Sequence, residues 1–257
     1  MRLPSNEFLK SLRRGKKQIG LWVSLSHSFA ADVVAQSGYD WVMIDMEHSP
    51  NDYFSVLGQL QVFASTKTVP IVRPEWNNSV VVKRLLDLGA PGLLFPMINT
   101  VDDARKAIAS TQYPPKGNRG VSAATRATKF GRIKGYAQSA ENEIAVFLQI
   151  ESKQGLSNAI DIAQLEGIDG IFFGPGDIAA DIGKVGQPNH PEVWDIIDPI
   201  AEALIKKGMP VGTLVGSSDK AVKLVNSGYS CVACGSDVSL LAKSSDALLN
   251  DVKNGLR

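Results

Sequence analysis

Eight short apolar segments recur along this chain, and each is followed by a segment in which apolar residues are spaced by three and four. This alternation of near-continuous apolar strands with helices is typical of a parallel sheet that is covered on its outer face. The predicted strands are residues 19–24, 41–45, 69–73, 92–97, 144–151, 170–173, 210–215 and 230–234. Eight such units in 257 residues predict a single α/β domain, residues 1–257, folded as a (β/α)8 TIM barrel.

Local signals also favour a closed barrel over an open sheet. The first predicted strand is not followed by the G-x-G-x-x-G pattern of a dinucleotide-binding open sheet. No Gly/Ser-rich or Pro-rich linker divides the chain into two domains. Several helical segments are followed by the residue that usually stands just past a helix end, namely Gly38, Gly89, Gly208 and Gly228.

Charge and hydropathy argue against two classes of partner. The formal net charge of +1 gives no reason to expect binding to nucleic acid or to an anionic membrane surface. No apolar run approaches the roughly 20 residues needed to span a bilayer. The basic N-terminal stretch also lacks the apolar middle of a signal peptide. We therefore expect a cytoplasmic protein without nucleic-acid or membrane partners.

The two cysteines, Cys231 and Cys234, have the C-x-x-C spacing of a redox or zinc pair. They lie in a predicted strand, where an offset of three residues places two side chains on opposite faces. A redox pair usually opens a helix, and a zinc site needs further ligands nearby. We interpret both cysteines as packing residues.

Polar side chains stand where several of the predicted strands end. In a barrel the loops after the strands converge on one face, and catalytic groups gather there. These side chains are Asp45, Glu47 and His48 after the second strand, Arg73 after the third, Gln149 and Glu151 in the fifth, and Asp177 after the sixth. Because Gln149 and Glu151 are two residues apart in a strand, they face the same way. The sequence therefore predicts one polar cluster at the barrel mouth.

Two acids of this cluster, Glu151 and Asp177, stand on neighbouring strands. Carboxylates that are open to water and ligand suit a hard divalent cation such as Mg²⁺ or Mn²⁺. Zinc would more often recruit His or Cys, and neither stands beside these acids. The alternative is that both acids pair with arginine or cap helices.

An arginine and a histidine are candidates for the chemistry. The guanidinium of Arg73 can clamp a carboxylate or stabilise a developing enolate, and its alternative is an ion pair with Asp45 or Glu151. His48 is a candidate acid or base, because Asp45 is close enough in sequence to orient its imidazole. The alternative is a surface histidine. The other two histidines are His27, which could also reach the mouth, and His190, which we interpret as a helix lead-in.

The remaining loops leave several possibilities open. Residues 216–218 and 235–237 combine Gly and Ser just before helices, which is the usual phosphate position of barrels but equally typical of plain N-caps. The lysine nearest to a strand end is Lys153, so Schiff-base chemistry is disfavoured. Residues 113–140 form a long basic connection without any acid, and it is either a functional or interface element or a solvated loop.

These residues form part of a larger pattern. The blocks "GLWVSLSHSFAADVVAQSGYDWVMIDMEHSPND", "PIVRPEWNN", "YPPKGNRGVS", "FLQIES" and "IFFGPGDIAADIGKVGQPNHPEV" occur in this order over nearly the whole chain, from about Gly20 to the last strand. Together they resemble the metal-dependent (class II) pyruvate aldolases, a family that includes 4-hydroxy-2-oxoheptanedioate aldolase and 2-dehydro-3-deoxyglucarate aldolase.

The resemblance implies a role for each matching residue. Glu151 and Asp177 match the metal ligands, which would hold Mg²⁺ or Mn²⁺, with Co²⁺ as a further candidate. His48 matches the acid/base histidine, Asp45 its partner, and Arg73 the arginine on the keto oxygen. The residues that match the substrate-binding set are Gln149, the backbone of Gly174, Pro175 and Gly176, and the pocket-lining Trp22 and Leu214. Asp87 matches an acid near a neighbouring subunit's site.

At the level of the assembly and the reaction, the resemblance implies a homo-hexamer, a trimer of dimers, in which the last helix is exchanged between subunits. The reaction would be reversible cleavage of a 4-hydroxy-2-oxo acid to pyruvate, or a close 2-keto acid, and an aldehyde, as in the catabolism of aromatic compounds or sugar acids. Two departures from the family pattern are Met46, where a glycine is usual, and Gly176, where Ala or Ser is common. The alternatives are a phosphate-handling barrel enzyme and a non-catalytic oligomer that binds 2-keto acids.

Overall fold

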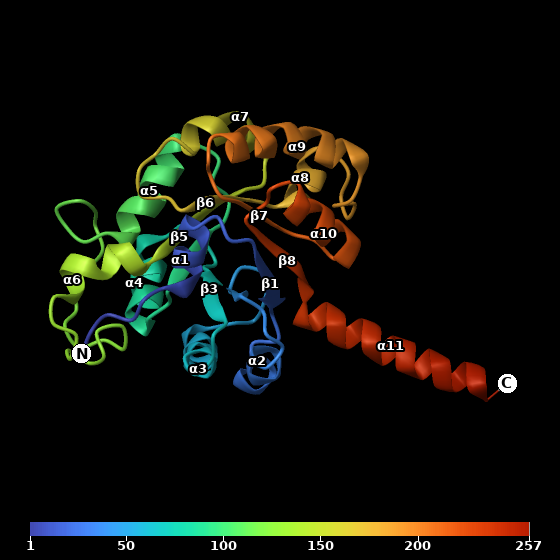
Figure 1. Cartoon of the computed structure of the whole chain (residues 1–257), viewed down its shortest axis with the longest axis horizontal. Helices are drawn as coiled ribbons and strands as arrows, with labels where there is room; N and C mark the ends of the chain where they lie inside the picture. The colour runs from blue at the N-terminus through green and yellow to red at the C-terminus, as the bar shows by residue number, and fades with distance from the viewer. Residues whose placement is uncertain (257) are drawn as a thin grey trace.

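Eight parallel strands close into a barrel in the computed structural model, which describes residues 1–256 of the chain (Figure 1). Each strand pairs with the next one in the chain, and β8 pairs with β1 to complete the ring. The strands are β1 (Gln18–Val23), β2 (Trp41–Asp45), β3 (Val69–Arg73), β4 (Gly92–Phe95), β5 (Ala145–Ile150), β6 (Gly170–Phe173), β7 (Val211–Leu214) and β8 (Cys231–Ser236). The predicted (β/α)8 fold is confirmed.

Helices cover the outside of the barrel (Figure 1). They are α1 (Glu7–Arg13), α2 (Ser28–Ala35), α3 (Tyr53–Phe63), α4 (Ser79–Leu88), α5 (Val101–Thr111), α6 (Tyr136–Ser139), α7 (Lys153–Ile162), α8 (Pro175–Asp181), α9 (Pro191–Lys206), α10 (Ser218–Asn226) and α11 (Asp237–Gly255), with a short 3₁₀ helix, η1 (Ala140–Glu143). None of them, over residues 1–256, is long and apolar enough to cross a membrane.

The apolar core has two layers, as expected for strands that are buried on both faces. The outer layer lies between the strands and the helices and contains, for example, Ile44 and Leu148. The inner layer fills the barrel with large rings, among them Trp41, Phe147 and Phe172. Phe8 of α1 packs against Trp41 and Phe147 with ring centroids 5.9 and 5.7 Å apart, so α1 closes the end at which the strands begin. The opposite end of the barrel, where the strands finish, is not closed by α1 and can hold a functional site.

The two cysteines are packing residues, as predicted. Both are free thiols. Cys231 belongs to the inner layer, whereas Cys234 packs against the outer layer, so their side chains point to opposite faces of β8. The pattern C-x-x-C therefore reflects the strand geometry and not a redox or metal pair.

The last helix, α11, behaves differently from the others. It runs away from the barrel toward the C-terminus instead of lying along the outer face (Figure 1). Its first residue is anchored, because the Asp237 carboxylate accepts hydrogen bonds from the backbone amides of Ser24 and Leu25 at 2.9 and 3.1 Å. Beyond this anchor the leucines of α11, including Leu248 and Leu249, are exposed.

Candidate active site

Arg73 is at the centre of the polar cluster at the barrel mouth. It ends β3 directly opposite Asp45 of β2, because the parallel register pairs these two residues. Its Nε and Nη2 donate to the two carboxylate oxygens of Asp45 at 2.8 and 2.7 Å, which is a bidentate pair. The two side chains are only 6% and 3% exposed. The ion pair with Asp45, one of the alternatives raised by the sequence, is therefore present.

Trp22 of β1 completes the support of this pair. Its indole Nε1 donates to Asp45 Oδ2 at 3.2 Å, and the Arg73 guanidinium lies 5.1 Å from the centre of its ring. Burial alone would raise the pKa of Asp45, but the hydrogen bonds and charge of Arg73 outweigh it, and the pKa lies below its ordinary value. Arg73 is thus held as a fixed cation at the mouth.

Glu47 is a further member of the cluster, and no role for it was predicted from the sequence. Its Oε2 lies 2.8 Å from Arg73 Nη1, as an ion pair whose geometry is not that of a hydrogen bond. Burial raises the pKa of Glu47 despite Arg73, and the charges of Asp45 and Asp177 add to the shift. The position of Glu47 depends on the turn after β2, in which Asp45 Oδ1 accepts from the Glu47 amide at 3.0 Å. The one sequence signal for Glu47 was its position directly after the end of a predicted strand.

His48 lies at the rim of the mouth with its side chain 64% exposed. Asp45 was expected to orient the imidazole, but its oxygens are taken by Arg73, Trp22 and backbone amides, including that of His48 itself at 3.5 Å. The carboxylate near the imidazole is that of Glu47, whose Oε2 is 4.0 Å from His48 Nε2. The structure therefore places Glu47, not Asp45, beside the imidazole, because the bidentate pair with Arg73 occupies Asp45.

Glu151 is buried below the cluster. The Gln149 side-chain amide donates to Glu151 Oε2 at 2.6 Å, so the two side chains share one face, as predicted from their spacing. The Met97 amide donates to Glu151 Oε1 at 2.7 Å. Burial raises the pKa of Glu151 to about 8; the Met97 amide opposes this shift, while the charges of Glu47 and Asp177 add to it.

The two glycines of the turn after β6, Gly174 and Gly176, differ in whether a larger side chain would fit at their position. A Cβ on Gly174 would lie 2.6 Å from Glu151 Oε2 and 2.8 Å from Glu151 Cβ, so only glycine lets the chain pass this carboxylate. A Cβ on Gly176 would meet nothing within 4 Å. Gly174 is the N-cap of α8, and no side chain caps this helix start.

A cavity of about 380 Å³ lies above these groups, at the end where the strands finish. It collects almost all of the residues that the sequence assigned to substrate and chemistry; its lining includes Trp22, His48, Arg73, Gln149, Gly174, Pro175, Gly176, Asp177 and Leu214. Loops β7–α10 and β8–α11 add Gly216 and Ser236. The structure thus brings together residues from seven of the eight strand ends.

The donors present fit a divalent cation. Glu151 and Asp177 supply two carboxylates that repel each other and Glu47, and Gln149 Oε1 is buried without a hydrogen-bond donor among the described residues. No group of three or more His, Cys, Asp or Glu within residues 1–256 has the geometry of a metal site. Two carboxylates with water and substrate as further ligands suit Mg²⁺ better than zinc.

Four other candidates from the sequence lie outside the cavity, namely His27, His190, Ser217 and Asp87, whereas Ser236 lines it. His27 and His190 accept the capping hydrogen bonds of α2 and α9, so His190 is a helix lead-in as predicted. Ser217 and Ser236 are the N-caps of α10 and α11, as the plain reading of their loops predicted. Asp87 lies on α4 and pairs at 3.3 Å with Arg119.

The basic connection is only partly solvated. The side chain of Arg119 is fully buried and lies over the Tyr113 ring at 4.6 Å. Arg126 donates to the backbone carbonyls of Leu88 and Leu60 at 2.7 and 3.2 Å. These contacts tie residues 113–140 to α3 and α4, while Val121 remains 72% exposed.

Comparison with known proteins agrees with this geometry. The model of the HpcH/HpaI aldolase/citrate lyase family matches residues 18–244. The chain is 48% identical over 248 residues to a protein named pyruvate aldolase from Rhizobium etli, covering 96% of this chain and 98% of that protein. It is 43% identical to 4-hydroxy-2-oxo-heptane-1,7-dioate aldolase from Escherichia coli, covering 95% of this chain and 93% of that protein.

The fold has a close counterpart among solved structures. A HpcH/HpaI aldolase/citrate lyase family protein from Burkholderia cenocepacia J2315 superposes with a TM-score of 0.93 at 37% identity. The alignment covers 97% of this chain and all of that protein. Relatives that bear aldolase names support a lyase of the aldolase type. By sequence over nearly its whole length and by fold, the chain belongs to the HpcH/HpaI aldolase/citrate lyase family.

Proposed function

We propose that this protein is a metal-dependent pyruvate aldolase, which reversibly cleaves a 4-hydroxy-2-oxo acid to pyruvate, or a close 2-keto acid, and an aldehyde. The observation that carries the proposal is a cavity at the barrel mouth lined by Arg73 and Asp177, with the buried Glu151 directly below it and hydrogen-bonded to the lining residue Gln149. Fixed positive charge beside a pair of carboxylates is suited to a substrate that is itself a carboxylate and develops further negative charge.

A divalent cation held by Glu151 and Asp177 would supply Lewis acidity toward the 2-keto acid, with Mg²⁺ or Mn²⁺ as the first candidates and Co²⁺ as a further one. Gln149 holds Glu151 in place through its hydrogen bond. The uncapped start of α8, at Gly174 to Gly176, would receive the substrate carboxylate. Trp22 and Leu214 would contact the substrate, because they line the same cavity.

In this proposal His48 is the general base. The imidazole takes the proton of the 4-hydroxyl, the C3–C4 bond breaks, and an aldehyde leaves. The electron pair of that bond moves toward the 2-keto oxygen, where the cation Arg73 stabilises the developing charge by an amount on the order of 3 kcal/mol. A proton is then added to carbon 3, which gives pyruvate. Glu47, 4.0 Å from His48 Nε2, would stabilise the imidazolium.

We expect His48→Ala to abolish most cleavage, by roughly a hundredfold or more, because a positioned base contributes that much. The fold should be unaffected, since the side chain is 64% exposed. The measurement is pyruvate release from a panel of 4-hydroxy-2-oxo acids, with equimolar aldehyde. The control is His27→Asn, which removes another histidine but keeps a side chain that can cap α2.

Three results would count against the proposal. Full turnover in His48→Ala would show that another group is the base. Binding of pyruvate without cleavage or synthesis, across the whole panel, would favour a non-catalytic 2-keto-acid-binding oligomer. Competition by inorganic phosphate would instead favour a phosphate-handling enzyme, although Ser217 and Ser236 are already used as helix caps.

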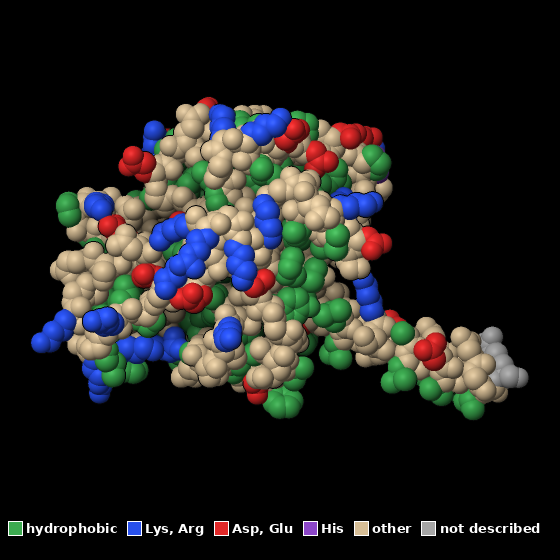
Figure 2. Space-filling view, in the orientation of Figure 1, with side chains coloured by type: hydrophobic (Ala, Val, Ile, Leu, Met, Phe, Trp, Pro, Cys, Tyr) green, Lys and Arg blue, Asp and Glu red, His purple; other side chains and the backbone are tan. Residues whose placement is uncertain are grey.

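We further propose that the protein is a homo-oligomer, a hexamer built from dimers, that exchanges α11 between subunits. Two observations support this. Apolar side chains on α11 are exposed over its whole length, and Phe29 and Val33 of α2 and Val222 of α10 are exposed on the barrel. Hydrophobic side chains gather both on α11 and on the part of the barrel beside its origin (Figure 2). Large exposed apolar surfaces of this kind mark association sites.

A further inference from the structure

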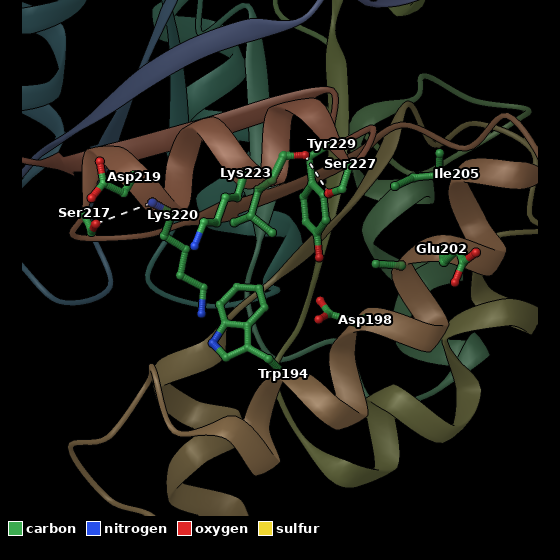
Figure 3. Close-up of a pocket in the computed structure, with 12 residues that line it drawn as sticks. Trp194, Asp198, Glu202, Ile205, Ser217, Asp219, Lys220, Lys223, Ser227 and Tyr229 are labelled. Atoms are coloured by element: carbon green, nitrogen blue, oxygen red, sulfur yellow. Dashed lines mark hydrogen bonds between the residues drawn. The ribbon is translucent and has the colours of Figure 1, made fainter.

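A cavity of about 730 Å³ lies between α9 and α10, on the outer face of the barrel (Figure 3). Its floor is apolar and is formed mainly by Ala201, Ile205 and Leu224. Trp194 closes one end, and its ring is covered by Lys220, whose Nζ lies 3.4 Å from the ring centre. The cavity is separate from the candidate active site, with which it shares no lining residue.

The two walls of this cavity differ in charge: α9 contributes only acids to the lining, whereas α10 contributes two lysines and one exposed acid, Asp219. Asp198 lies on α9, and Lys220 and Lys223 lie on α10 (Figure 3). Within residues 1–256 none of these three groups forms an ion pair within 4.0 Å. Glu202, the other acid of α9 in the lining, is taken up by Lys206 at 2.7 Å. Asp198, Lys220 and Lys223 therefore line the cavity without a direct ion-pair partner among the described residues.

A buried hydroxyl that lines the cavity, that of Tyr229, also lacks a hydrogen-bond partner among the described residues. Tyr229 is only 2% exposed, and its Oη has no hydrogen-bond partner among the described residues. In Figure 3 this hydroxyl points across the cavity toward the Asp198 carboxylate. A buried hydroxyl without a partner is costly, so a polar ligand group beside Asp198 would relieve it. A second, independent observation thus points to a polar ligand at the same wall.

We propose that this cavity binds a small zwitterion with an apolar side chain, that is, an apolar α-amino acid. The ammonium of such a ligand would be bound by Asp198 and the Tyr229 hydroxyl, and its carboxylate by Lys220 and Lys223. The apolar side chain would lie on the floor between the two helices. Asp198 on one wall and two lysines on the other, above an apolar floor, suit a zwitterion better than a simple anion or a simple cation.

The test is calorimetric titration of the full chain with L-leucine, L-valine and L-phenylalanine. We expect saturable binding of at least one of them, with one site per chain. Three comparison compounds each lack one feature: 4-methylpentanoate has no ammonium, 3-methylbutylamine has no carboxylate, and glycine has no apolar group. Each should bind roughly tenfold more weakly or worse, since hydrogen bonds to charged groups, and burial of an apolar side chain in the case of glycine, are each worth about this factor.

Variants locate the binding in this cavity. Asp198→Asn and Lys220→Gln should each weaken binding roughly tenfold or more while leaving aldol turnover unchanged. Their matched controls are Asp195→Asn and Lys207→Gln, which remove the same charges from exposed positions outside the lining. Tyr229→Phe should weaken binding without lowering thermal stability in the absence of ligand, because its hydroxyl has no partner to lose.

Two outcomes would overturn the proposal. Absence of saturable binding of all three amino acids would exclude the ligand class. Binding that is unchanged in Asp198→Asn and Lys220→Gln, or that is displaced by pyruvate, would place the amino acid elsewhere. Neither outcome affects the aldolase proposal. That proposal concerns the cavity at the barrel mouth, which is lined by different residues, and it is tested by pyruvate release.

Discussion

The side chains at the barrel mouth show what one sequence can and cannot predict about single residues. The sequence predicted that Arg73 and Asp45 could pair, because both end strands that are adjacent in a barrel, and the register places them opposite each other. It assigned no role to Glu47 and chose the wrong neighbour for the His48 imidazole. The positions of the Glu47 and His48 side chains both depend on the path of the short turn after β2. The directions of side chains in a turn do not follow from strand periodicity.

The buried pair of Asp45 and Arg73 should make stability depend on pH. The pKa of Asp45 is lowered in the folded protein, so its contribution is fully present above the unfolded pKa of about 4 and is lost as the pH falls through the lower folded value. We expect wild type to be more stable than Asp45→Asn near neutral pH, by an amount on the order of 3 kcal/mol, and this gap to narrow in acid.

Urea unfolding of both proteins over a series of pH values measures this gap. Taking the difference between wild type and Asp45→Asn removes the contributions of the other carboxyl groups, to the extent that they do not couple to Asp45. A gap that stays constant from neutral pH into acid would show that the carboxylate of Asp45 has no special stability in the folded state.

At the scale of elements, the sequence was a good guide. The observed strands agree with the predicted ones to within about two residues at each end, because buried parallel strands are apolar on both faces and end abruptly. The alternation of β5 also predicted that Gln149 and Glu151 lie together. The cavity between α9 and α10 was not predicted, because the gap between two helices depends on how they pack across the barrel surface and not on the pattern of either helix.

The turn from β6 into α8 allows a matched pair of substitutions. Gly174→Ala should displace Glu151, since the new Cβ would lie 2.6 Å from its Oε2, and misplacement on this scale costs roughly a hundredfold in turnover. Gly176→Ala should keep turnover within a few fold, because its Cβ meets nothing within 4 Å. Comparison of kcat/KM for the two variants checks this. Equal losses would mean that the close approach of Gly174 to Glu151 is unimportant.

At the scale of the whole molecule, α11 is the feature that a single chain does not explain. Leu248 and Leu249 are 68% and 52% exposed and lie far along α11 from their own barrel. Replacing both by Ser should dissociate the oligomer, because each buried leucine contributes roughly 1.5–3 kcal/mol. Light scattering after size exclusion gives the mass, and Val185→Ser, at a 75% exposed loop residue, is the control. A wild type that is monomeric, or a double variant of unchanged mass, would refute the exchange.

The central claim is that carbon–carbon cleavage at the barrel mouth needs a divalent cation held by Glu151 and Asp177. The most direct measurement is pyruvate release from a 4-hydroxy-2-oxo acid by enzyme treated with EDTA, with its metal content determined, before and after addition of Mg²⁺ or Mn²⁺. We predict loss of turnover on metal removal and recovery on addition in wild type, but no recovery in Glu151→Gln or Asp177→Asn. Undiminished turnover in verified metal-free wild type would contradict the claim.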